Sequence, residues 1–137
     1  MTATLPDEAG AWANDWRDRL NDNDAFADAA ADLDARFLCE IRPDDAYDGD
    51  PVAFVIELAN GTVPDAGGVD GDADYDFALR GPYTAWKDML NDDIDVASAV
   101  LGGTFDVEGS MVTLMRYQEA FGEMIGDAQR IDTDFAY

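Results

Sequence analysis

The stretch that decides the fold is DFALRGPYTAWK, residues 76–87, continued by IDVASAVLGGTFDVEGSM, residues 94–111. Apolar side chains first occupy every second position, which predicts a strand, and after Gly81 they recur every three or four residues, which predicts a helix. The positions that carry these two patterns are Tyr75, Phe77 and Leu79 in the strand, then Tyr83, Trp86 and Leu90 in the helix.

A second helix, a strand and a third helix are expected after residue 94. Residues 94–101 have helical spacing, and the two glycines that follow end the helix. Residues 104–108 alternate as a strand, and Ser110 is suited to cap the next helix because its hydroxyl accepts a bond from a free backbone N–H. That last helix has the widest apolar stripe, made of Met111, Leu114, Met115, Phe121, Met124 and Ile125 with Gln118 as its polar member.

The preceding half of the chain begins with helices and continues with strands. Residues 6–33 have helical spacing, with Trp12, Trp16 and Leu20 four residues apart and a break near 21–24, so two helices are expected. Two alternating segments follow, the first with Phe37, Cys39 and Ile41 and the second with Val52, Phe54, Ile56 and Leu58. The pair Asn60-Gly61 predicts a turn, and the glycine- and aspartate-rich sequence up to Asp74 predicts a loop.

These elements predict a mixed α/β fold. The length of 137 residues suits one domain with one core, so we expect a single domain over residues 1–137. Its N-terminal helices would cover residues 6–33, and its strands and remaining helices would cover residues 35–126. The hydrophobic fraction of 47% and the aromatic fraction of 11% are those of a folded chain.

The charge is strongly negative and restricts the partners. The chain has 31 acidic and 8 basic residues, a formal net charge of −23, and 25 of the acids are aspartates. Nucleic acid and anionic membranes both require clustered basic side chains, so neither is an expected partner. Acidic surfaces of this kind are screened in concentrated salt, which suggests the cytoplasm of a halophilic host. No apolar run approaches the roughly 18 residues of a membrane span, so we expect neither membrane insertion nor export.

Catalytic chemistry is not indicated. The chain has no histidine and one cysteine, so the commonest metal ligand is missing and an intrachain disulfide is impossible. Cys39 shares a strand face with Phe37 and Ile41, which predicts a small buried side chain rather than a reactive thiolate. We expect no catalytic residue, no metal and no cofactor.

One segment resembles the start of a calcium-binding loop. Asp70, Asp72 and Asp74 alternate as in such loops, but Tyr75 stands where the loop requires glycine and Gly81 where it requires glutamate. A solvated loop is the simpler interpretation.

Methionines gather in the C-terminal half, where Met89, Met111, Met115 and Met124 lie near aromatic residues. Methionine fills irregular cores, and it also lines sites that accept varied apolar ligands. The pattern alone leaves both interpretations open.

The motifs in residues 76–87 and 94–111 resemble the sterol carrier protein type 2 family. The shared features are a strand, a helix that an aromatic residue leads, a short helix before glycine, a strand that ends in glycine, and an amphipathic helix. The resemblance implies a curved, mostly antiparallel sheet of four to five strands, with helices on one face and an apolar cavity between them. It also implies non-enzymatic binding or transfer of a hydrophobic small molecule or lipid. For a halophilic archaeon, an isoprenoid lipid or a quinone is a better candidate than a sterol, and a fatty acyl chain stays open.

The resemblance also assigns the site. Carried onto this chain, the cavity wall comprises Phe54, Ile56, Phe77, Leu79, Trp86, Leu90, Val100, Leu101, Met111, Leu114, Met115 and Phe121. The candidates to meet a polar head group are Arg80, Tyr83, Arg116, Tyr117 and Gln118. Two alternatives are kept: a scaffold or dimerisation module, in which side chains close the cavity and the chain forms a homodimer, and a lipid hydrolase or transferase.

Overall fold

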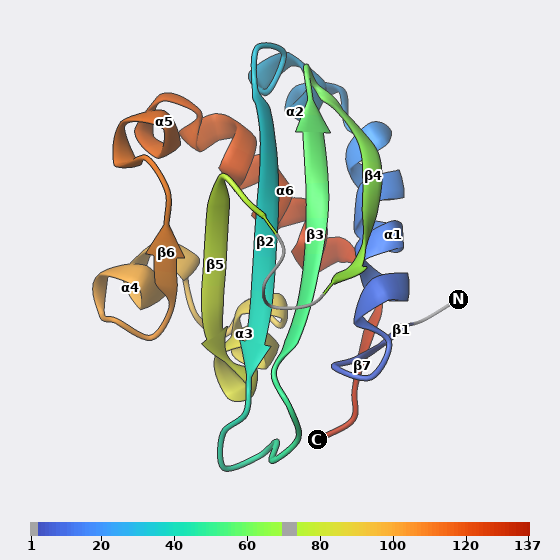
Figure 1. The fold of residues 1–137 in the computed structure, drawn as a ribbon, viewed down its shortest axis with the longest axis vertical. Coiled ribbons are helices and arrows are strands. Elements are labelled where there is room, and N and C mark those ends of the chain that lie inside the picture. Colours follow the sequence, from blue (N-terminus) through green and yellow to red (C-terminus); the bar gives the residue numbers. More distant parts are fainter. Residues whose placement is uncertain (1–2, 70–73) are drawn as a thin grey trace.

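Five strands form one sheet, and helices cover one of its faces (Figure 1). The computed structural model describes residues 3–69 and 74–137. The strands lie in the order β4-β3-β2-β5-β6, and neighbours are antiparallel except β2 and β5, which are parallel. The mostly antiparallel sheet expected from the sequence is therefore confirmed. The strand bounds are Asp34–Arg42 (β2), Val52–Ala59 (β3), Thr62–Val69 (β4), Phe77–Pro82 (β5) and Asp106–Glu108 (β6).

The helices lie behind the sheet in Figure 1 or beside its β6 edge. Helix α1 packs against β3 and β4, and α6 packs against α1, α2 and α3. The bounds are Ala9–Asn21 (α1), Asp24–Ala29 (α2), Tyr83–Leu90 (α3), Val96–Leu101 (α4), Met111–Arg116 (α5) and Gln118–Arg130 (α6). Within the described residues no helix is both long enough and apolar enough to cross a bilayer.

Strand alternation separates the two faces of the sheet. Phe37, Cys39 and Ile41 in β2 point into the main core, on the side that the helices cover. Leu38 of the same strand belongs to a second, small buried cluster with Val55 of β3 and Ala78 of β5 on the opposite side. This separation follows from the two-residue period of a strand, which sends successive side chains to opposite faces.

Tryptophans fix α1 to the rest of the molecule. The Trp12 and Trp16 rings lie 5.4 Å apart, and Trp12 lies 5.4 Å from Phe54 of β3. Trp16 Nε1 donates to the Met124 carbonyl at 2.9 Å, and Trp12 Nε1 donates to Thr133 Oγ1 at 2.8 Å. The apolar ring area is buried and the indole N–H groups are satisfied, so the first helix is tied to the C-terminal segment.

Local sequence signals set several element ends. Asn60 and Gly61 have φ angles of 52° and 88°, which confirms the turn between β3 and β4. A Cβ at Gly61 would lie 2.6 Å from the Ala27 carbonyl oxygen, so the close approach of α2 also favours glycine there. The Ser110 side chain accepts from Thr113 N at 3.3 Å, which confirms the expected cap of α5.

The loop expected directly after the Asn60-Gly61 turn is wrong over residues 62–69, which form the edge strand β4. Proline, aspartate and glycine give this segment low strand propensity. Pairing with β3 supplies the missing backbone partners, and Pro64 is tolerated because β4 lies at the edge of the sheet. The interpretation of the calcium-like sequence as a solvated loop concerns residues 70–73, which lie outside the described residues.

Other element bounds also differ from the expectations. The single helix over 111–125 is wrong, because Tyr117, with φ −109° and ψ 27°, separates α5 from α6. Strand β5 begins at Phe77 rather than at Tyr75, and α4 begins at Val96 rather than at Ile94. Strand β6 begins at Asp106, two residues later than expected. The strands β1 (Ala3–Leu5) and β7 (Thr133–Phe135), which pair in parallel, were not expected at all.

Candidate functional site

A cavity of about 1030 Å³ lies between the sheet and the helices α1, α3, α4, α5 and α6. Its lining is mainly aromatic and aliphatic and includes most of the methionines. The residues that line it are Trp12, Trp16, Phe37, Cys39, Leu79, Trp86, Met89, Asp92, Asp95, Val100, Leu101, Gly103, Phe105, Asp106, Val107, Met111, Leu114, Met115, Gln118, Phe121, Gly122, Met124, Ile125, Gly126, Ala128 and Gln129.

The inner wall presents ring faces rather than polar groups. Trp12, Trp16 and Trp86 line it, and each indole N–H already has a protein partner. Trp86 Nε1, for example, donates to the Glu40 carbonyl at 2.9 Å. With their donors satisfied, these side chains offer a ligand only apolar surface.

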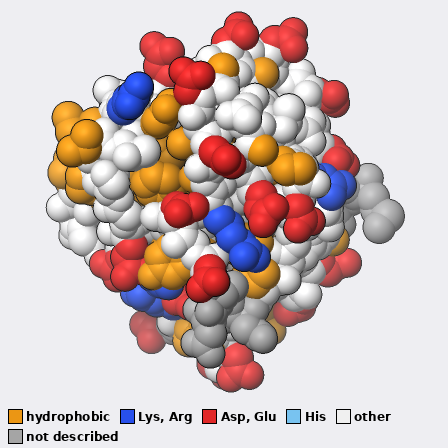
Figure 2. Space-filling model, turned by 45° about the horizontal axis from the view of Figure 1, so that its top comes forward, with side chains coloured by type: hydrophobic (Ala, Val, Ile, Leu, Met, Phe, Trp, Pro, Cys, Tyr) orange, Lys and Arg blue, Asp and Glu red, His pale blue; other side chains and the backbone are white. Residues whose placement is uncertain are grey.

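The outer wall is a segment that we call the flap, residues 96–116, which comprises α4, β6 and α5. Of its described side chains, only Ala99 and Phe105 are buried. Leu101 is 89% exposed and Val112 is 78% exposed, which shows that this end of the cavity faces solvent. Figure 2 shows apolar side chains gathered on the side of the molecule where α4 and α5 lie, whereas carboxylates are spread over the rest of that view.

Phe105 anchors the flap to the sheet. Its ring contacts Trp86 edge to face at a centroid distance of 5.3 Å, and its side chain is 1% exposed. A Cβ on Gly81 would overlap the Phe105 ring, so glycine at this position in β5 leaves the space that the ring fills. Gly81, where the sequence predicts the change from strand to helix, thus also allows Phe105 to hold the flap against the sheet.

Cys39 lies on the inner wall and has no base beside it among the described residues. Its side chain is buried, and this burial raises the pKa of the Cys39 thiol well above its usual range. The thiol therefore stays protonated and acts as a small apolar wall group, which confirms the interpretation from strand alternation. In the described part of the chain, no group of three or more acidic or cysteine side chains is arranged to hold a metal ion.

Eight of the twelve expected wall residues line this cavity: Leu79, Trp86, Val100, Leu101, Met111, Leu114, Met115 and Phe121. The other four, Phe54, Ile56, Phe77 and Leu90, are buried outside its lining. Phe54 lies behind Trp12 and Trp86, whose rings are 5.4 and 6.1 Å away. On α3, Met89 takes the place in the lining that was assigned to Leu90. Ligand contact by these four side chains stays a prediction.

The head-group candidates are less well placed. Gln118 lines the cavity, whereas the other four have partners elsewhere. Arg80 forms ion pairs with Glu40 and Glu108. The Tyr83 hydroxyl donates to the Tyr137 carbonyl, the Tyr117 hydroxyl donates to the Asp32 carbonyl, and the Arg116 guanidinium lies over the Tyr117 ring at 5.6 Å.

Much of the inner wall was not predicted from the sequence. Trp12, Trp16, Phe37, Met89 and Phe105 line the cavity but were interpreted only as helix, strand or core positions. The four-residue spacing of the two tryptophans gave their helix face. It gave no information on which strand that face would meet, because this depends on tertiary packing.

The sequence matches the SCP-2 sterol transfer family over residues 13–122. This chain belongs to that family. SCP-2 domains bind lipids and sterols and are generally not enzymes. A search of curated proteins finds none that matches the chain.

Solved structures agree with the membership in the SCP-2 family. The crystal structure of sterol carrier protein 2 has a TM-score of 0.81 and 27% identity, over 89% of this chain and 96% of that one. The solution structure of a conserved hypothetical protein from Thermus thermophilus, described as possibly a sterol carrier protein, has a TM-score of 0.78 and 27% identity, over 90% of this chain and 87% of that one. The sec-alkyl sulfatase PisA1 shares the fold at a TM-score of 0.51 and 17% identity, where 70% of this chain covers 14% of the enzyme.

Proposed function

We propose that this protein is a lipid carrier that holds one apolar ligand in the cavity and performs no chemistry on it. The observation that carries the proposal is the volume of about 1030 Å³, bounded by apolar side chains and reaching solvent at the flap. Burial of apolar surface contributes about 25 cal/mol per Å², so a long hydrocarbon chain supplies ample binding energy. An isoprenoid lipid or a quinone is the preferred ligand, ahead of a fatty acyl chain or a sterol-like molecule.

The scaffold alternative requires a core that side chains close. The side chains of the inner wall are closely packed, but an apolar hollow of about 1030 Å³ that reaches solvent remains between them and the flap. The size and the apolar lining therefore favour the carrier over a module that acts only by dimerisation. Pairing of β1 with β7 ties the two ends of the described chain together, which supports one domain over residues 1–137.

The direct test is native mass spectrometry of protein purified in concentrated salt, followed by solvent extraction and identification of any lipid that co-purifies. A stoichiometric lipid is the expected result. An empty protein that also takes up no fluorescent acyl chain would favour the scaffold.

Two glycines of α6 allow a cavity-filling test. Gly122 and Gly126 line the cavity, and a Cβ at either position would meet no heavy atom within 4 Å. Gly122→Leu with Gly126→Leu should abolish lipid uptake and leave the fold intact, because both side chains enter open space. The control, Gly122→Ala with Gly126→Ala, should keep uptake and raise helix stability by up to about 1 kcal/mol per site.

We also propose that the protein works in the cytoplasm of a halophilic archaeon. The support is the excess of acidic over basic residues, 31 against 8. Their mutual repulsion is weak only when salt screens it, so the melting temperature should fall as salt is diluted. A melting temperature that is unchanged between molar salt and dilute buffer would contradict this proposal.

A further inference from the structure

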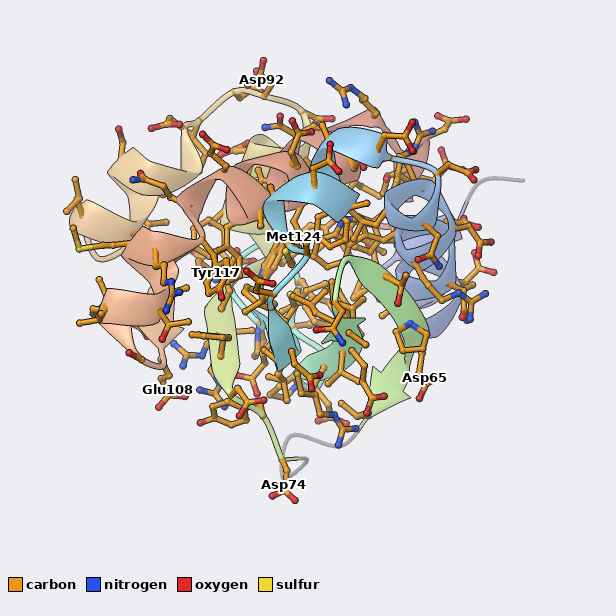
Figure 3. All side chains as sticks on the ribbon, turned by 90° about the horizontal axis from the view of Figure 1, so that it is seen from above. Asp65, Asp74, Asp92, Glu108, Tyr117 and Met124 are labelled. Atoms are coloured by element: carbon orange, nitrogen blue, oxygen red, sulfur yellow. The ribbon has the colours of Figure 1, made fainter. Side chains whose placement is uncertain are left out.

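The charged residues that line the cavity all have the same sign. They are Asp92, Asp95 and Asp106, and within residues 3–69 and 74–137 no lysine or arginine lines it. All three aspartates are exposed, so they belong to the mouth rather than to the interior. In Figure 3, Asp92 lies at the periphery and points away from Met124, which lines the cavity near the centre of the view.

These carboxylates differ in how far they are neutralised. Asp106 accepts a hydrogen bond from Arg42 Nη1 at 2.8 Å and forms an ion pair with it. Asp95 accepts from Ser98 N and Ser98 Oγ, both neutral donors, at 3.2 Å. Neither Asp92 nor Asp95 forms an ion pair with any described residue. The mouth therefore carries about two negative charges that no neighbouring cation offsets.

The cations on this side of the molecule have partners. Arg80 is paired with Glu40 and Glu108, and Arg42 is paired with Glu40 and Asp106. Arg116 forms no ion pair with a described residue, but it lies beside the Tyr117 ring on the exposed surface of α5 and does not line the cavity.

The interior does not compensate for the mouth. The three indole N–H groups of its wall are bonded to protein acceptors, and Gln129 Nε2 donates to the Met89 carbonyl at 3.0 Å. An ionised head group inside the cavity would lose its hydration, and these N–H groups could not replace it because they already have protein acceptors. The transfer of the charge would therefore cost free energy. The head group must therefore stay at the mouth, next to the aspartates.

We propose that the cavity selects lipids with an uncharged polar end, such as a hydroxyl or a carbonyl, and rejects lipids with an anionic head group. This inference rests on the proposed carrier function and narrows its ligand class. A carboxylate or phosphate at the mouth meets like charges, whereas a hydroxyl donates a hydrogen bond to them. Neutral isoprenoid alcohols fit this requirement best, because their hydroxyl donates to the aspartates. A quinone carbonyl has no proton to donate but avoids the charge repulsion, whereas a free fatty acid meets it.

The first experiment compares two ligands with the same hydrocarbon chain on the full protein. Hexadecanol and hexadecanoate each displace a bound uncharged fluorescent lipid at about pH 8, where the acid is ionised. Hexadecanoate should bind about fivefold more weakly, the effect of one close contact between like charges in water. The ratio should shrink as salt is raised from the lowest concentration at which circular dichroism shows a native fold, because salt screens the repulsion.

The second experiment removes the charge without changing the backbone. Asp92 has φ 60°, a conformation that asparagine tolerates, and Asp95 caps α4, a role that asparagine fills equally well. Asp92→Asn with Asp95→Asn should bring the two ligands close to equal affinity. The matched control, Asp28→Asn with Asp65→Asn, changes the net charge equally at exposed sites outside the cavity lining and should keep the preference.

The outcomes separate this inference from the carrier function. If wild-type protein binds both ligands equally, selection against anions is wrong and the carrier function stands. If hexadecanoate binds more tightly and Arg116→Gln removes that advantage, Arg116 is the head-group site and the inference is overturned. If neither ligand displaces the probe and no lipid co-purifies, the carrier function itself fails.

Discussion

The two walls of the cavity are built in opposite ways. The inner wall, formed by the sheet with α1, α3 and α6, is held by tilted and edge-to-face contacts between aromatic rings and by hydrogen bonds from three tryptophans. The outer wall is the flap, which rests on Phe105 and otherwise exposes most of its described side chains. The inner wall is therefore the rigid part of the cavity. The flap makes few buried contacts, so few contacts are lost when a ligand enters beside it.

The flap and the rest of the molecule also differ in charge. Residues 96–116 contain Asp106, Glu108 and Arg116 as their only charged residues, so nearly all of the net charge of −23 lies elsewhere in the chain. The flap itself is thus apolar and nearly neutral, whereas the unpaired aspartates of the mouth, Asp92 and Asp95, lie just before it in the sequence. We expect the flap to respond weakly to salt and the rest of the fold strongly.

The largest effect is expected in the inner wall. Trp16→Ala should destabilise the protein by about 3–5 kcal/mol, because it removes a buried aromatic ring and the hydrogen bond to the Met124 carbonyl. Chemical denaturation in molar salt measures it. Trp16→Phe keeps most of the ring area and should reduce the stability much less. A small loss of stability in Trp16→Ala would show that the inner wall is not the rigid part of the cavity.

A more local effect is expected at the anchor of the flap. Phe105→Ala should cost about 3 kcal/mol, the lower end of the range for a buried aromatic side chain, and speed amide hydrogen exchange in residues 98–116, while the amides of β2 stay protected. Gly81→Ala should loosen the same residues, because its Cβ overlaps the Phe105 ring. Exchange that rises equally in both walls would remove the distinction between them.

A smaller and pH-dependent effect is expected at Asp44, which joins the loop after β2 to α3. Its carboxylate accepts backbone N–H groups of Ala46, Tyr47 and Thr84 at 2.8–3.0 Å. Desolvation alone would raise the pKa of Asp44, but these hydrogen bonds outweigh it and the pKa is lowered. A lowered pKa gives stabilisation that is present above the unfolded value of about 3.9 and is lost as pH falls through the folded value.

Asp44→Ala should therefore cost about 1 kcal/mol near neutral pH, the usual loss for a helix cap. Denaturation curves of the wild type and the variant should converge at acid pH. A difference between them that is the same at pH 7 and at about pH 3 would show that the carboxylate charge contributes nothing.

The smallest effect is expected on the outer surface of the flap. Val112→Ser removes an apolar side chain that is 78% exposed, so the stability should change by less than about 0.5 kcal/mol. The same denaturation assay measures it, with Trp16→Ala as the reference. A loss of several kcal/mol would show that Val112 is covered in solution.

The order of the main elements could be predicted because each carries its own period. The four-residue spacing of Trp12 and Trp16, the alternation in β2 and β3, and the change of period after Gly81 are local signals. The strand β4 was missed because its residues have poor strand propensity and only its pairing with β3 makes it a strand. The three-residue strands β1 and β7 are far apart in the sequence, so no local pattern predicts their pairing.

The site was only partly predictable for a related reason. The stripe on the last two helices identified Met111, Leu114, Met115 and Phe121, since one helix face is enough to define it. The inner wall depends on how α1 crosses the sheet. Phe54 lies on the strand face that the alternation predicts, but Trp12 and Trp86 cover it. This tertiary packing cannot be inferred from residue spacing.

The tryptophans of the inner wall have one further consequence. Trp12, Trp16 and Trp86 are the three tryptophans of the chain, and all of them line the cavity. The ultraviolet emission of the protein therefore comes from the surface that a ligand would touch, with no tryptophan elsewhere to add background. The three rings are almost fully buried, so a saturated lipid should change the emission little, whereas a quinone bound against them should quench it. The chain thus contains an intrinsic optical reporter of its own cavity.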